Sequence, residues 1–140
     1  MCGEISKVSA RDTPGGVCAP ATILVVEDEE VVRDFLTSAL ELDGHTVAAV
    51  PNGKVALEYL ATHTVDAILA DCLMPVMGGC ELHEELRRRQ NPLADRMGFI
   101  SGDMDRDPVR KFMAEHEVPT LQKPFGMMDL RELLARVLPG

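Results

Sequence analysis

The chain has 140 residues, of which 46% are hydrophobic and 26% are charged, a balance that fits one globular domain with a core of its own. Its net charge of −9 argues against nucleic acid or an anionic membrane as a partner, because phosphate groups are bound through Lys and Arg. We find no apolar run near the roughly 20 residues that span a bilayer and no secretory signal pattern. These features lead us to expect a cytoplasmic protein.

Residues 1–20 contain several Gly and Pro among scattered polar residues and show no apolar period. We interpret them as a disordered tail or linker, followed by one folded domain over residues 21–140. The four cysteines, Cys2, Cys18, Cys72 and Cys80, form no C-x-x-C pair. This spacing favours reduced thiols over a disulfide framework or a zinc site.

Strand patterns and helix patterns alternate five times along the folded part. Apolar runs predict buried strands over residues 22–26, 46–50, 65–71, 97–100 and 118–122. Helical spacing predicts helices that end near residue 43, begin near 52, span about 80–89, run from 107 to about 116, and close the chain around 130–138. Such alternation predicts an α/β fold with a parallel, doubly wound sheet and helices on both faces.

The strand predicted over residues 65–71 is the most informative, because its apolar run ends in a single carboxylate, Asp71. A loop with Pro75, Gly78 and Gly79 follows. Open α/β sheets bind ligands in the crevice outside the carboxyl ends of their strands. Taken alone, however, Asp71 could equally be a loop cap.

The other strands also end in polar groups. Glu27 and Asp28 follow the first strand, Ser101 the fourth and Lys123 the fifth. Crowded carboxylates need positive charge nearby; Lys123 supplies one, and a hard divalent cation such as Mg²⁺ would supply the rest. With Asp71 as nucleophile and Ser101 as a hydrogen-bonding group, this set is suited to phosphoryl transfer.

The motifs around these residues resemble the receiver domain of two-component response regulators, a domain also fused to hybrid histidine kinases. The matching stretches are residues 25–29, 71–79, 100–102 and 123–125, and the resemblance covers residues 23–138. It implies a flavodoxin-like fold, with a five-stranded parallel sheet of order 2-1-3-4-5 flanked by five helices.

For the metal, the resemblance implies Mg²⁺ bound directly by Asp28 and by the phosphoacceptor Asp71. Glu27 would act mostly through a metal-bound water. The backbone carbonyl of Leu73 would be a further ligand.

For the phosphoryl group, the resemblance implies contacts from Ser101 and Lys123, and a cis peptide between Lys123 and Pro124. The donor would be a histidine kinase or a histidine phosphotransfer protein. Phosphorylation would then change the surface formed by the fourth helix, fifth strand and fifth helix. The domain would not be an enzyme beyond catalysing its own phosphotransfer and autodephosphorylation.

The chain departs from the family pattern at several positions. Glu27 replaces the commoner Asp, and Gly78 stands where Asp is frequent, which predicts a more flexible loop. Thr120 occupies a position where many members have Tyr or Phe, so the rotating aromatic switch is missing in its usual form. Leu73 cannot orient a water molecule, whereas Asp103 could do so or could repel anions.

Other functions are open but less well supported. A pseudo-receiver that is never phosphorylated would not need Asp28, Asp71, Ser101 and Lys123 together. A haloacid-dehalogenase type phosphatase would need an Asp-x-Asp motif, and a flavin site would need a phosphate loop after the first strand. The chain shows no helix-turn-helix and no basic face, so we expect no DNA binding. A stand-alone regulator and a piece of a hybrid kinase both remain compatible with the sequence.

Overall fold

Five parallel strands form a single sheet at the centre of the molecule. The computed structural model describes residues 19–74, 76–102 and 107–138. The strands are β1 (Thr22–Val26), β2 (Thr46–Val50), β3 (Ala67–Asp71), β4 (Met97–Ser101) and β5 (Thr120–Gln122). They are ordered β2-β1-β3-β4-β5, and each neighbouring pair is parallel. The predicted strand order is therefore confirmed.

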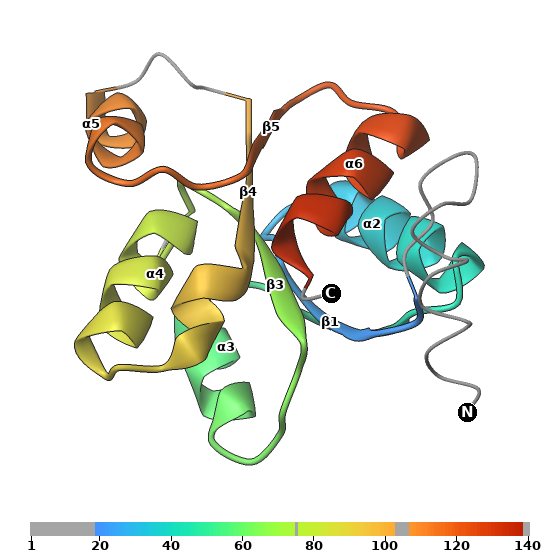
Figure 1. The fold of residues 1–140 in the computed structure, drawn as a ribbon, viewed down its shortest axis with the longest axis horizontal. Coiled ribbons are helices and arrows are strands. Elements are labelled where there is room, and N and C mark those ends of the chain that lie inside the picture. The colour runs from blue at the N-terminus through green and yellow to red at the C-terminus, as the bar shows by residue number, and fades with distance from the viewer. Residues whose placement is uncertain (1–18, 75, 103–106, 139–140) are drawn as a thin grey trace.

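Helices cover both faces of this sheet. Among the described residues there are five α-helices: α2 (Glu30–Leu42), α3 (Gly53–Leu60), α4 (Gly79–Arg88), α5 (Asp107–Glu115) and α6 (Met127–Val137). Figure 1 shows α3, α4 and α5 on one side of the strands and α2 and α6 on the other. This arrangement is the predicted doubly wound fold.

Two hydrophobic cores result, one on each face. Alternate residues of β1 divide between them: Leu24 and Val26 pack toward the side of α3, α4 and α5, whereas Ile23 and Val25 pack toward α2 and α6. All four are fully buried. A strand covered on both faces has no solvent side, which is why its apolar run is continuous rather than alternating.

Several element ends follow the signals in the sequence. The backbone of Gly44, just after α2, is left-handed with φ of 94°, a conformation that glycine adopts readily. The side chain of Asn52 accepts a hydrogen bond of 2.9 Å from the amide of Val55 and so caps the start of α3.

Two strands begin later than predicted. β3 starts at residue 67 rather than 65, and the side chain of Asp66 accepts a 2.8 Å hydrogen bond from the amide of Thr22. β5 starts at Thr120 rather than at residue 118. Pro119 has no N–H to give to the ladder, although its carbonyl accepts from the amide of Phe99 at 2.9 Å.

A short 3₁₀ helix, η1 (Pro92–Arg96), lies between α4 and β4 and was not predicted. Its start carries a recognisable signal, since the side chain of Asn91 accepts a 2.9 Å hydrogen bond from the amide of Leu93 and a proline opens the helix. The predicted tail over residues 1–20 lies almost entirely outside the described residues. None of the described helices has the length and apolar character needed to cross a membrane.

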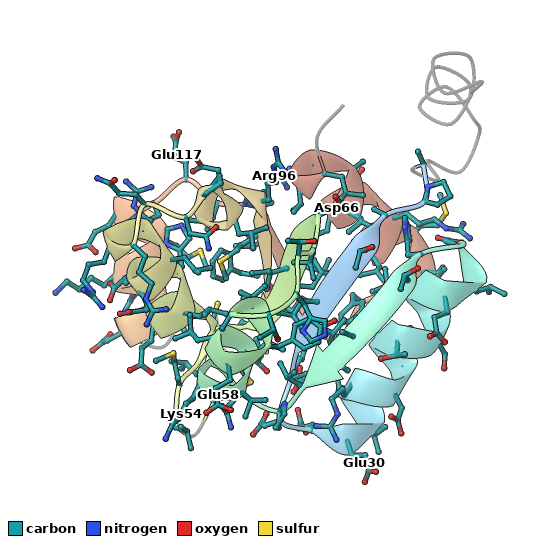
Figure 2. The ribbon with its side chains drawn as sticks, turned by 90° about the horizontal axis from the view of Figure 1, so that it is seen from below. Glu30, Lys54, Glu58, Asp66, Arg96 and Glu117 are labelled. Atoms are coloured by element: carbon teal, nitrogen blue, oxygen red, sulfur yellow. The ribbon has the colours of Figure 1, made fainter. Side chains whose placement is uncertain are left out.

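The two ends of the sheet carry different elements. Glu30 and Lys54, in the first turns of α2 and α3, lie at the opposite end of the molecule from Asp66, Arg96 and Glu117, which precede strands (Figure 2). The carboxyl ends of the strands therefore share one edge with the helix starts. The candidate site residues belong to that edge.

Candidate functional site

Asp71 and Lys123 form the centre of the site. Asp71 is the last residue of β3 and is 9% exposed. Its Oδ2 lies 2.9 Å from the Nζ of Lys123, directly after β5, and its Oδ1 accepts a 3.2 Å hydrogen bond from the amide of Leu73. One carboxylate oxygen is thus held by a lysine that follows another strand, and the other by a backbone amide of the loop directly after β3.

Glu27 is buried beside this pair. It follows β1 directly and is 1% exposed. Its Oε1 lies 3.4 Å from the Lys123 Nζ, and its Oε2 accepts from the amide of Glu29 at 3.1 Å. Burial raises the pKa of Glu27 to about 7; the Glu29 amide opposes this rise and the charge of Asp71 adds to it. The ammonium of Lys123, 3.4 Å away, also lowers this pKa, so burial of the carboxyl outweighs the positive charge beside it.

The same edge holds a set of oxygens suited to a metal ion. Carboxylate oxygens of Glu27, Asp28 and Asp71 all lie within 4.8 Å of one another, and Asp28 is exposed to solvent. No other group of three or more possible His, Cys, Asp or Glu ligands occurs in the described part of the chain. Hard oxygen donors, with one open to water, fit Mg²⁺, which keeps several of its own waters.

Lys123 balances more negative charge than the sequence predicted. Its Nζ also lies 3.3 Å from the carboxylate of Glu29. Burial alone would lower the pKa of Lys123, but the hydrogen bond and charge of Asp71, followed by Glu27 and Glu29, raise it overall. The ammonium group therefore stays charged. Glu29 was not among the predicted site residues, although it lies in the acidic run before α2.

Arg33 is a second residue that the sequence analysis missed. Its Nη1 donates a 2.9 Å hydrogen bond to the backbone carbonyl of Glu27. The only signal is its position six residues after Glu27, on the first turns of α2. Arg33 thus fixes the turn between β1 and α2 that carries the acidic residues.

Ser101 lies at the same edge, at the end of β4, and is 2% exposed. Its backbone carbonyl accepts a 2.9 Å hydrogen bond from the amide of Lys123, and the peptide between Lys123 and Pro124 is cis. Thr120 is half-buried at the start of β5, so no aromatic ring stands at that position. Asp103 lies outside the described residues.

The glycines after Asp71 bring the loop against the strand. An ideal Cβ on Gly78 would lie 2.3 Å from the carbonyl oxygen of Cys72, and one on Gly79 would lie 2.6 Å from that of Asp71. Both distances are too short for any side chain. Close approach explains glycine at residue 78, and the flexibility of the loop stays a prediction.

The family model of the response regulator receiver domain matches residues 23–135. The chain belongs to this family. Response regulator MprA of Mycolicibacterium vanbaalenii is 34% identical over 127 residues, which is 86% of this chain and 53% of that protein. Sensor kinase CckA of Brucella abortus is 33% identical over 120 residues, 84% of this chain and 12% of the kinase. The receiver domain thus spans about half or less of these relatives.

Solved structures agree with this assignment. Chemotaxis protein CheY4 of Vibrio cholerae superimposes with a TM-score of 0.75 at 27% identity, covering 86% of this chain and all of that one. The receiver domain of sensor histidine kinase PA1611 from Pseudomonas aeruginosa has the same TM-score and identity, over 85% of this chain and 98% of that one. That structure has a magnesium ion coordinated in its active site cleft. The chain is therefore a receiver domain of the two-component type.

Proposed function

We propose that this receiver domain accepts a phosphoryl group from a phosphohistidine onto Asp71, with Mg²⁺, and that the modification changes its partner-binding surface. One observation carries the proposal. The Asp71 carboxylate lies 2.9 Å from a lysine ammonium and shares a cluster of oxygens within 4.8 Å with Glu27 and Asp28. This arrangement surrounds a nucleophile with the charges that phosphoryl transfer needs.

In the transfer, one oxygen of Asp71 attacks phosphorus as the bond from phosphorus to the donor imidazole breaks. Lys123 pairs with Asp71 before the transfer. It would then pair with an oxygen of the transferred phosphoryl group. Glu27, Asp28, Asp71 and the carbonyl of Leu73 would hold Mg²⁺. When bound, the ion neutralises charge on the phosphoryl oxygens. The domain catalyses at most its own phosphorylation and dephosphorylation and turns over no other substrate.

An apolar hollow next to the site supports a protein as the phosphoryl donor. It has a volume of about 550 Å³ and is lined by Glu29, Val32, Phe35, Lys123, Pro124 and Phe125. Phe35 is 45% exposed and packs edge-on against Phe125, with ring centroids 5.9 Å apart. Exposed apolar surface beside a reactive group is typical of protein docking sites. A histidine kinase or phosphotransfer protein is the occupant that would bring a phosphohistidine to Asp71.

The switch would begin at Ser101. A phosphoryl group on Asp71 adds oxygens that the Ser101 hydroxyl can bond, and the Ser101 carbonyl is already joined to the amide of Lys123. Movement of Ser101 would therefore act on β5 and on the surface of α5, β5 and α6. Thr120 has no ring to rotate, so the response would be carried by the backbone of this region.

Phosphorylation by acetyl phosphate, with and without Mg²⁺ and followed by intact mass, tests the proposal. We expect the wild type to gain one phosphoryl group only with Mg²⁺ and Asp71→Asn to gain none. Asp34→Asn removes an exposed carboxylate of α2 and should behave as the wild type. Absence of an adduct in the wild type, together with no response to beryllofluoride, would instead support a pseudo-receiver.

A further inference from the structure

Two thiols lie beside the phosphoacceptor and take no part in the function proposed above. Cys72 directly follows Asp71 and is 1% exposed, whereas Cys80, the second residue of α4, is half-buried. The amide of Cys80 approaches the carbonyl of Cys72 at 3.4 Å. Both are free cysteines. The chain thus brings together two residues that lie eight positions apart in sequence.

The two glycines that precede Cys80 pack closely against the end of β3. Gly78 and Gly79 lie against the carbonyls of Cys72 and Asp71, at distances that exclude a Cβ. The start of α4 is therefore fixed against the end of β3. With their backbones in contact, the two cysteines are neighbours in space, as a disulfide requires.

Both thiols border one cavity. A hollow of about 380 Å³ between α4 and α5 is lined by Cys72, Leu73, Cys80, Glu81, Glu84, Lys111, Phe112 and Glu115. A small solute such as a peroxide would approach the more exposed cysteine, Cys80, through this hollow. Metal binding is a weaker reading, because among the described residues the cysteines gather no third ligand and structural zinc needs four.

The two thiols differ in exposure. Cys80 is half-buried, whereas Cys72 is 1% exposed. This difference suits Cys80 to react first with an oxidant and Cys72 to follow.

We propose that Cys72 and Cys80 form a redox-sensitive pair that closes to a disulfide with peroxide and slows phosphorylation of Asp71. The Cys80 sulfur attacks one peroxide oxygen and the O–O bond breaks. Water is released, and Cys80 becomes a sulfenic acid. The Cys72 thiol then attacks that sulfur, and the sulfenic oxygen departs as a second water. One peroxide is reduced by two electrons while two thiols are oxidised.

The effect on Asp71 rests on the function proposed above. A disulfide, with its two sulfur atoms about 2 Å apart, would tie the side chain of Cys72 to the start of α4 and so restrain the backbone of residue 72. That residue lies between Asp71 and Leu73, whose amide holds the Asp71 carboxylate. A misplacement of about 1 Å can cost roughly 100-fold in rate. We therefore expect phosphorylation to slow by about tenfold or more.

The experiment uses the full chain with Cys2→Ser and Cys18→Ser, which leaves two thiols. After hydrogen peroxide and N-ethylmaleimide, we expect peptide mass spectrometry to find residues 72 and 80 linked and unalkylated. The rate of phosphorylation by acetyl phosphate should fall, and dithiothreitol should restore it. Cys80→Ser in the same background should form no link and keep its rate after peroxide.

Three results would overturn the proposal: alkylation of both cysteines after peroxide, oxidation of Cys80 to a sulfinic acid without a link, or a link that leaves the rate unchanged. The reduced protein separates this proposal from the phosphoacceptor function. Failure of the reduced protein to take up a phosphoryl group would count against that function and against the rate effect. The linked peptide would still show whether the cysteine pair closes.

Discussion

At the scale of single residues, the turn after Asp71 depends on the lack of space for a side chain at residue 78. Gly78 has an ordinary extended backbone, with φ of −90°, so a residue with a side chain could adopt it. The constraint comes instead from the carbonyl of Cys72, 2.3 Å from where a Cβ would lie. Any residue with a Cβ at this position would have to push the loop away from the strand.

Gly78→Ala should therefore lower the free energy of unfolding by about 1–3 kcal/mol, the usual cost of inserting a group into a packed site. Urea denaturation measures this change. Gly102→Ala is the matched control, because the nearest atoms to its Cβ are 3.7 Å away, an ordinary contact. Equal stability of the two variants would show that the loop at residue 78 yields without cost.

At the scale of secondary structure elements, the first half of α2 has an exposed apolar surface that its own fold does not use. Val31 is 82% exposed and Phe35 is 45% exposed, and Phe35 borders the hollow beside Lys123. The amino terminus of this helix follows the acidic residues of the site. A donor that delivers its phosphoryl group to Asp71 would cover this surface.

Val31→Asp and Phe35→Asp should each slow phosphotransfer from a phosphorylated histidine kinase or phosphotransfer domain by about tenfold or more, the loss expected of a central interface residue. Phosphorylation by acetyl phosphate should not change, since no docking is involved. Leu42→Asp, at the other end of α2 and 79% exposed, is the control. A similar loss with acetyl phosphate would mean that these residues support the site itself rather than the docking.

At the scale of the whole molecule, α4, α5 and β4 meet around a buried histidine. His83 is 2% exposed, and its ring centroid lies 5.7 Å from that of Phe99, 5.2 Å from that of Phe112 and 4.9 Å from that of His116. Its Nδ1 has no hydrogen-bond partner among the described residues. Burial lowers the pKa of His83 to about 4, with the positive charges of His116 and Arg87 adding to the effect.

This shift predicts how stability depends on pH. The unfolded chain takes up a proton on this histidine near pH 6.5, whereas the folded chain does so only near pH 4. The unfolded state therefore binds more protons between these values, and stability falls as pH falls through this range. The contribution is complete above pH 6.5, and about 2 kcal/mol of it should be lost at pH 5.

We would measure urea unfolding of the wild type and of His83→Phe at pH 7.5 and pH 5. The comparison separates the contribution of His83 to the pH dependence of stability from that of the carboxylates. The variant should lose less stability than the wild type on acidification. His63→Gln removes an exposed histidine and should leave the pH dependence as it is. A wild type and a His83→Phe variant with the same pH dependence would contradict the assignment.

The sequence by itself determined the order of strands and helices, because each element leaves a local pattern of apolar residues and end signals. It also determined which chemical groups share the functional edge. In a parallel sheet all strands point the same way, so residues that follow β1, β3, β4 and β5 must meet. Asp71 and Lys123, 52 residues apart, accordingly lie 2.9 Å from each other.

Only the tertiary structure decided the features that depend on distances between distant segments. The sequence places Glu29 in an acidic run, but only packing shows that it reaches Lys123. Likewise, only packing shows that Gly78 contacts the carbonyl of Cys72 and that His83 is enclosed by aromatic rings. Periodicity reports which face of an element is buried, but it carries no information about which atoms of another element lie a few ångströms away.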